Sequence, residues 1–273
     1  MTHAFPRLGR RSLSDRSPFY LNGWLVIILL TAAWLTVACA RFSPSDIPRD
    51  LAAEQMVAGL RSTNTHLTRF KCVGKIILSV PQQPVQSFRA AIAGQLTDRL
   101  RIDMFAPFGG SAGTVSSDGE HLFLVMHPSG EYYKRRFGSG SLEKMIKIDL
   151  SVSDLLELLV GRIPMNAEFS ARLASNDHTG LPDLLLVDRW GKTRQRVTVD
   201  GAMHPVASVW FDGHQNPVYT LTVTGTQTIG GFVLPMRIDL SGPSGERVTV
   251  NLDRYEVDAH LDETLFSLDP PSS

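Results

Sequence analysis

Residues 99–104 read Arg-Leu-Arg-Ile-Asp-Met, and charged and apolar side chains alternate through them. Because successive side chains of a β-strand point to opposite faces, this segment predicts a strand with one buried and one solvated face. Residues 70–80 alternate in the same way. Clusters of turn-forming residues separate further runs of this kind along the chain. The pattern predicts about ten strands, joined by hairpins into one antiparallel sheet.

Two segments show helical rather than alternating spacing. Residues 48–64 predict an amphipathic helix with Ser45 or Asp46 as its cap. Residues 151–161 predict a leucine-rich helix that begins with a capping box and ends at a glycine. Residues 261–268 predict a last short element. A sheet of this size has to curl, close or be covered. We therefore expect an α+β fold, mainly antiparallel β, with an incomplete, half-open β-barrel covered by helices.

The first 38 residues have the layout of an export signal. Residues 1–23 carry four arginines and one acid, and residues 24–38 carry no charge. This apolar stretch is shorter than the ~20 residues of a spanning helix, so we expect its removal rather than its retention as an anchor. It ends in Val-Ala followed by Cys39 and Ala40, which resembles a bacterial lipobox and predicts lipidation of Cys39. Cleavage by the ordinary signal peptidase at this small-residue site is the alternative.

The balance of basic and acidic residues indicates which classes of partner the chain can bind. The chain has 27 basic and 27 acidic residues, but four of the basic residues and one acidic residue lie before Cys39. The exported part is therefore mildly acidic, which argues against binding to nucleic acid. Cys72 is the only cysteine besides Cys39. We interpret it as a small core residue, or as a disulfide partner of Cys39 if that residue is not lipidated.

Several apolar stretches follow one another in a set order: residues 100–109, 118–119, 132–133, 155–164, 234–240 and 262–266. In this order they resemble the LolB-like lipoproteins of the periplasmic lipoprotein-sorting family. The resemblance implies a cavity for acyl chains between the sheet and its helices, and we expect its lining to include Leu100, Ile102, Met104, Leu155, Leu158 and Leu159. It also implies that Phe108, between a proline and a glycine, forms a membrane-insertion loop. A Phe108 that folds back over the end of the sheet is the alternative.

No segment predicts a catalytic or metal site. Residues 109–113 match the Gly-x-Ser-x-Gly pattern of hydrolases, but a strand rather than a helix is expected after Ser111, so we interpret them as a glycine-rich bend. The histidines are scattered and lack metal-ligand spacing. Lys134, Arg135 and Arg136 form either a membrane-facing patch or a solvated strand end. Carboxylates on exposed strand positions are interpreted as solvated: Asp98, Asp103, Asp188, Asp239 and Asp253.

The sequence thus predicts a signal peptide with lipobox (1–38), a lipidated tether (39–47), a LolB-like half-barrel domain (48–268) and a C-terminal tail (269–273). We expect a non-enzymatic, monomeric lipoprotein without a cofactor, on the periplasmic side of a Gram-negative outer membrane. Its cavity would bind acyl chains of lipoproteins or lipids, delivered by a carrier of the LolA type, in lipoprotein localisation or envelope biogenesis. The alternative is a structural or adaptor lipoprotein with a filled cavity.

Overall fold

A computed structural model describes residues 50–136, 142–176 and 180–270. The predicted signal peptide and tether, including Cys39, lie outside these described residues. The described chain is mainly β, with helices α2 (Leu51–Ser62), α3 (Glu143–Ile146) and α4 (Val152–Leu159) and a short 3-10 turn, η1 (Glu263–Phe266).

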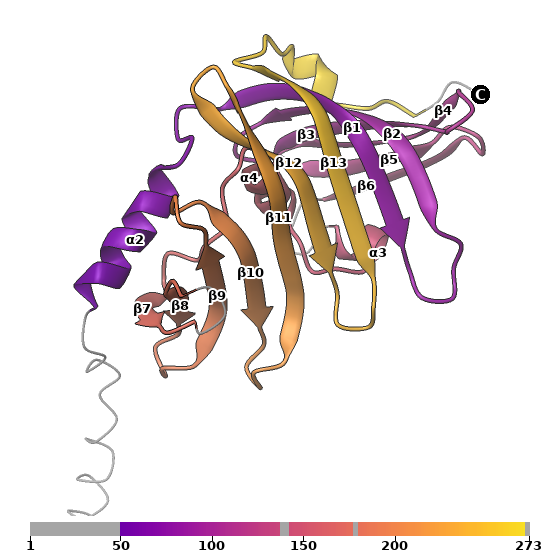
Figure 1. The fold of residues 1–273 in the computed structure, drawn as a ribbon. Coiled ribbons are helices and arrows are strands. Elements are labelled where there is room, and N and C mark those ends of the chain that lie inside the picture. Colours follow the sequence, from indigo (N-terminus) through magenta and orange to yellow (C-terminus); the bar gives the residue numbers. More distant parts are fainter. Residues whose placement is uncertain (1–49, 137–141, 177–179, 271–273) are drawn as a thin grey trace, which may run out of the picture. The chain divides into compact units, whose positions relative to one another are not determined.

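Thirteen strands form one antiparallel sheet (Figure 1). They are β1 (Arg69–Ser79), β2 (Gln86–Gln95), β3 (Arg99–Phe105), β4 (Ser111–Asp118), β5 (His121–Met126), β6 (Glu131–Arg136), β7 (Ser170–Ala174), β8 (Asp183–Val187), β9 (Thr193–Val199), β10 (Pro205–Phe211), β11 (Pro217–Ile229), β12 (Phe232–Ser241) and β13 (Arg247–Val257). The expected number of about ten is therefore too low. Strands of five residues, such as β7 and β8, show too few alternations to be recognised in the sequence.

The sheet curls but stays open within the described residues. Its strand order is β6-β5-β4-β3-β2-β1-β13-β12-β11-β10-β9-β8-β7, so β1 and β13 pair in the middle while β6 and β7 form the two edges. The connection between these two edge strands contains α3 and α4. Both helices lie inside the curl, between the front strands and the strands behind them (Figure 1). The expectation of a curled antiparallel sheet covered by helices is thus confirmed at this level.

Alternation along β1 and β2 sets which face is buried. Phe70, Cys72 and Ile76 are buried on the inner face. A side chain on Gly94 would meet the Phe70 ring at 2.5 Å and Leu156 of α4 at 2.7 Å, so this glycine lets α4 approach the sheet closely. Cys72 is free, and burial raises the pKa of its thiol. Its position fits the interpretation as a small core residue.

Helix α2 begins three residues later than expected, and its cap is Asp50. The Asp50 carboxylate accepts a hydrogen bond from the backbone N–H of Ala53 at 3.0 Å, which is the usual capping geometry. Its other oxygen accepts the N–H of Leu173 in β7 at 2.9 Å. The bond from Leu173 and the bond from Ala53 lower the pKa of Asp50. One carboxylate therefore starts the helix and fixes it to the sheet edge.

Helix α4 has the predicted capping box. Ser151 accepts the N–H of Asp154 at 3.0 Å, and Asp154 accepts the N–H of Ser151 at 3.2 Å. Leu156, Leu158 and Leu159 are all almost fully buried. The helix therefore inserts its leucine-rich surface into the curl of the sheet, where burial of such side chains stabilises the fold by about 1.5–3 kcal/mol each.

The last residues cover the opposite, outer face of strands β2 to β6. We call residues 258–270, which contain η1, the C-terminal strap. Phe266 is fully buried, and its carbonyl accepts a hydrogen bond from Ser116 at 2.6 Å. Arg101 donates to the carbonyl of Leu265 at 3.0 Å, and Tyr132 donates to that of Leu268 at 3.0 Å. The predicted last short element is present, and it buries a second, smaller core on the outside of the sheet.

Candidate functional site

An apolar cavity of about 120 Å³ lies between the sheet and the helices inside its curl. The sheet contributes side chains from β1, β2, β3, β4, β12 and β13, and the other wall comes from α3, α4 and the residues around them. All fifteen lining residues are hydrophobic: Ile76, Leu78, Ile92, Ile102, Met104, Val115, Leu142, Met145, Ile146, Leu150, Leu155, Leu159, Leu240, Val248 and Val250. A cavity without polar groups stays dry and favours an apolar occupant.

The structure places four of the six predicted lining residues at this cavity. Ile102 and Met104 reach it from β3, and Leu155 and Leu159 reach it from α4. The other two lie elsewhere. Leu100 is fully buried outside the cavity wall, and Leu158 lines a much smaller pocket beside Gly161.

The cavity adjoins a second pocket at the end of β1 and the start of β13. The two share Leu78, Met145, Ile146 and Val248. The outer pocket, of about 100 Å³, adds polar side chains from the β1–β2 turn, β2 and β13: Gln83, Gln86 and Arg247. Apolar interior space therefore leads to a polar rim at this end of the strands. The interior is small, because an apolar cavity of about 150 Å³ accommodates benzene. A whole acyl chain would require α3 or its side chains to move outward.

The β3–β4 turn carries the most exposed aromatic side chain among the described residues. Phe108 is fully exposed, with a relative accessibility of 103%. The turn is closed by hydrogen bonds between Ala106 and Gly109 at 3.0 Å and between Ala106 and Gly110 at 3.1 Å. Both glycines have positive φ, which suits this tight bend. Phe108 thus projects into solvent and does not fold back over the sheet.

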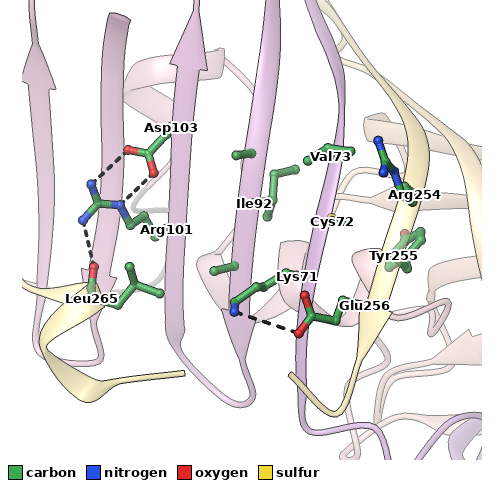
Figure 2. A pocket seen from close by; sticks show the side chains of 12 residues that line it. Lys71, Cys72, Val73, Ile92, Arg101, Asp103, Arg254, Tyr255, Glu256 and Leu265 are labelled. Atoms are coloured by element: carbon green, nitrogen blue, oxygen red, sulfur yellow. Dashed lines mark hydrogen bonds and ion pairs between the residues drawn. The ribbon is translucent and has the colours of Figure 1, made fainter. Parts of the chain in front are cut away.

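A wide groove of about 450 Å³ lies on the outer face, beside the C-terminal strap. Its walls carry paired charges: Arg101 with Asp103 on one side, and Lys71 with Glu256, 4.0 Å apart, on the other (Figure 2). Leu265 of the strap closes one end. Arg254 adds a third cation to the lining, beside these two pairs.

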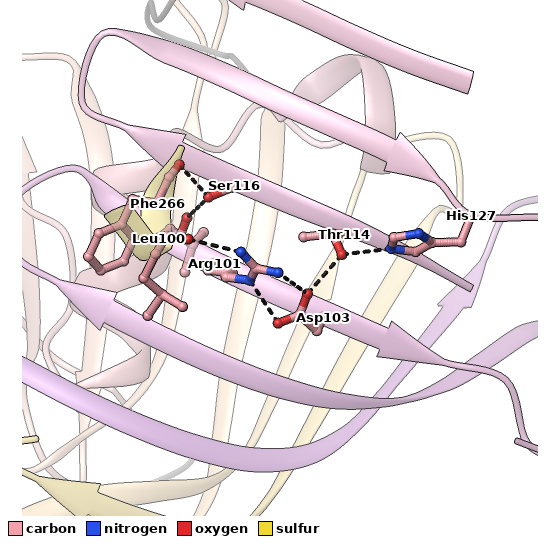
Figure 3. A network of polar contacts seen from close by, with 8 residues as sticks. Leu100, Arg101, Asp103, Thr114, Ser116, His127 and Phe266 are labelled. Atoms are coloured by element: carbon pink, nitrogen blue, oxygen red, sulfur yellow. Dashed lines mark hydrogen bonds and ion pairs between the residues drawn. The ribbon is translucent and has the colours of Figure 1, made fainter. Parts of the chain in front are cut away.

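A line of polar side chains runs along the outer face from Arg101 through Asp103 and Thr114 to His127 (Figure 3). Thr114 donates its single hydroxyl hydrogen to Asp103 at 2.8 Å. His127 therefore donates to Thr114, at 3.0 Å, and does not act as a base toward it. A threonine nucleophile would need the opposite arrangement. The network is consistent with a structural role.

The hydrolase-like pattern is a hairpin turn. Ser111 is the first residue of β4, and the chain after it continues as a strand. A nucleophile elbow requires a helix there, so the interpretation as a glycine-rich bend is confirmed. In the described part of the chain, no group of three or more His, Cys, Asp or Glu residues could hold a metal ion. No described helix has the length and apolar character needed to span a membrane.

One of the carboxylates interpreted as solvated is buried. Asp188 is only 7% exposed and accepts the N–H groups of Trp190 and Lys192 in the β8–β9 turn. The interpretation is therefore wrong for Asp188, because hydrogen bonds within the turn replace those to water.

Some lining residues were not expected from the sequence. Leu142, Met145 and Ile146 bring α3 to the cavity wall. Their spacing of three and four residues is helical, which is the signal that identifies them.

Solved structures with a similar fold include the following three. The first is a putative outer membrane lipoprotein-sorting protein domain from Vibrio parahaemolyticus, with a TM-score of 0.59 and 12% identity over 79% of this chain and 96% of that one. A DUF1329 family protein from Desulfovibrio piger has the same TM-score, identity and coverage of both chains. A LolA superfamily protein from Nitrosomonas europaea has a TM-score of 0.55 and 13% identity, over 79% of this chain and 97% of that one. At these identities the likeness concerns the fold alone.

No protein-family model matches the sequence, and no curated protein matches it. The fold of the chain is thus similar to the folds of a LolA superfamily protein and of a putative outer membrane lipoprotein-sorting protein domain.

Proposed function

We propose that this chain is an outer-membrane lipoprotein whose cavity binds an acyl chain of a lipoprotein or lipid in transit through the cell envelope. The observation that carries the proposal is the cavity between α3, α4 and the sheet, whose fifteen lining side chains are all hydrophobic. Such a lining offers nothing to a polar substrate but binds a hydrocarbon chain by the hydrophobic effect. The likeness to lipoprotein-sorting folds supports the same conclusion.

The remaining parts of the proposal come from the sequence. Residues 1–38 would be a signal peptide, and lipidation at Cys39 would anchor residues 48–268 through the tether 39–47. Several acyl chains on one residue give effectively permanent attachment, at about 0.8 kcal/mol per buried methylene. Phe108, exposed on a tight turn, would insert into a membrane surface when cargo is delivered. A periplasmic carrier of the LolA type would supply that cargo.

The test is native mass spectrometry of the full chain, produced in a Gram-negative bacterium and purified from its membranes. We expect part of the protein to carry the mass of an acylated molecule besides its own anchor. Leu155→Trp enlarges a side chain that lines the cavity and should remove this bound mass. Val73→Trp places the same bulk on the outer face, at a residue that is 37% exposed, and should retain it.

Circular dichroism and thermal unfolding verify that both variants are folded, since overfilling a core can cost about 1–3 kcal/mol. The proposal is wrong if the purified wild-type chain carries no acylated molecule, or if folded Leu155→Trp carries as much as the wild type.

The small volume of the cavity favours a second candidate. At about 120 Å³ the space accepts a ligand of roughly benzene size, so the side chains of the protein fill most of the curl themselves. In that case the chain is a structural or adaptor lipoprotein of the envelope. It would then purify without bound acyl chains other than its own anchor, and Leu155→Trp would leave its binding to envelope partners unchanged.

A further inference from the structure

The two edge strands of the sheet, β7 and β6, differ in what covers them. Helix α2 packs against β7, and Asp50 at its start accepts the backbone N–H of Leu173 at 2.9 Å. One edge is thus sealed by a helix and a carboxylate. On β6, by contrast, no described residue pairs with the free side of the strand. Its unpaired backbone N–H and C=O groups can bind another strand.

The free edge is strongly basic. β6 reads Glu-Tyr-Tyr-Lys-Arg-Arg, and all of its residues except Tyr132 are exposed. Lys134, Arg135 and Arg136 make no ion pair with any described residue. Lys134 instead lies over the Phe123 ring, 5.2 Å from its centre. The sheet therefore ends in consecutive cations whose charge is not compensated in the described part of the molecule.

We propose that β6 is a docking edge for an extended, acidic peptide segment of another protein, which adds to the sheet beside it. Added strands gain affinity from main-chain hydrogen bonds and specificity from their side chains. An uncharged strand gains only the backbone bonds, and an antiparallel second copy of β6 has a single acid, Glu131, to set against the three cations. An acidic strand gains both the backbone bonds and the ion pairs.

The pleat of β6 indicates what such a segment looks like. Successive side chains alternate between faces, so Lys134 and Arg136 lie on the face covered by the strap, while Tyr133 and Arg135 lie on the other. An antiparallel partner therefore presents three consecutive acids, one opposite each cation, followed by a β-branched residue opposite Tyr133. This side chain is 51% exposed and offers an aromatic surface for a cross-strand pair.

The probe is a fluorescein-labelled peptide, Ser-Glu-Glu-Glu-Val-Thr-Lys-Ser, titrated against the full chain purified from membranes. We expect saturable binding by fluorescence anisotropy, together with slower hydrogen exchange at backbone amides of residues 131–136. Lys134→Gln combined with Arg135→Gln should weaken binding by about fivefold or more, from the loss of two cross-strand ion pairs. A matched control, Lys75→Gln with Arg89→Gln, removes the same charge from exposed positions on β1 and β2 and should leave binding unchanged.

A second peptide, N-methylated at those alternate residues whose N–H groups face β6, keeps the charges but cannot form the ladder with β6. Weak binding of this peptide supports edge addition, and equal binding of both peptides contradicts it.

The proposal is also wrong if anionic phosphatidylglycerol vesicles bind the wild type through Lys134 and Arg135 while the peptide does not bind. A concentration-dependent dimer that slows exchange of the β6 amides without any peptide would assign the edge to a second copy instead. None of these results depends on whether the cavity holds an acyl chain.

Discussion

The β3–β4 and β12–β13 hairpins carry the same side-chain cluster on the outer face of the sheet, but the C-terminal strap lies across the arginine of only one of them. In β3–β4, Arg101 donates to both carboxylate oxygens of Asp103, at 2.8 and 3.1 Å. Thr114, on the neighbouring strand, donates to the same carboxylate at 2.8 Å. The local sequence around the ion pair is Arg-Ile-Asp.

The sequence Arg-Ile-Asp recurs in β12. Arg237 donates to Asp239 at 2.6 and 2.9 Å, and Thr249 on β13 donates to it at 2.5 Å. In both hairpins the threonine stands directly opposite the aspartate in the strand register. The same three residue types in the same register therefore give the same local geometry.

What differs is the C-terminal strap. Arg101 also donates to the backbone carbonyl of Leu265, which lies across it, whereas the additional partner of Arg237 is the side chain of Asn251 at 3.5 Å. The Arg101 side chain is accordingly 24% exposed and that of Arg237 46%. Since hydrogen bonds to charged groups gain strength away from water, the same cluster should contribute more to stability under the strap.

The largest expected effect is the loss of the strap. Phe266→Ala removes a fully buried ring from the outer core and should lower the free energy of unfolding by about 3–5 kcal/mol. We expect faster hydrogen exchange in η1 and on β4, and unchanged exchange on β12. The measurement is urea denaturation of the full chain together with exchange mass spectrometry.

Leu265→Ala is the matched control, because this neighbouring side chain is only partly buried, and it should cost clearly less. A Phe266→Ala variant of wild-type stability would mean that the strap is not part of the cooperative fold. The strap would then make no difference to what the two clusters contribute to the free energy of unfolding.

The covered cluster illustrates how far the sequence predicts this molecule. Alternation in residues 99–104 indicates strand β3 and its buried face, and the leucines of residues 151–161 indicate α4, because both signals are local. The same alternation predicts a solvated Asp103, and the side chain of Asp103 is 28% exposed. The strap that lies across Arg101 and Ser116 comes from residues 150 or more positions away in the chain, and no local pattern indicates which surface such a segment crosses.

The cavity was predictable to a similar extent. Ile102 and Leu155 lie at the cavity on facing elements, but the sequence does not indicate which of their neighbours reach the same space. Leu100 and Ile102 share one face of β3, yet only Ile102 lines the cavity. Where a given side chain ends depends on how far the sheet curls and how closely α4 approaches it, and these are properties of the assembled fold.

A direct comparison of the two arginines has the next largest expected effect. Arg101→Met should lower the free energy of unfolding by about 1.5–3 kcal/mol, because it removes charge-assisted bonds under the strap. Arg237→Met should cost clearly less, as is typical of ion pairs open to solvent. Methionine keeps much of the apolar stem of arginine, so packing changes little. Equal losses in the two variants would show that the strap does not strengthen the covered cluster.

The smallest expected effect is a pH dependence in the uncovered cluster. The hydrogen bond from Arg237, together with the one from Thr249, lowers the pKa of Asp239 below its ordinary value of 3.8. A carboxyl whose pKa is lowered by folding stabilises the folded state fully above its unfolded pKa, and this contribution is lost as the pH falls through the folded value. The difference in unfolding free energy between wild type and Asp239→Asn should therefore be constant from about pH 7 to 5 and shrink below the ordinary carboxyl pKa.

In an Arg237→Met background, which lacks the main cause of the lowered pKa, most of this pH dependence should disappear. A difference that stays constant down to about pH 2 would mean that the Arg237 bond does not hold Asp239 in its charged form in solution.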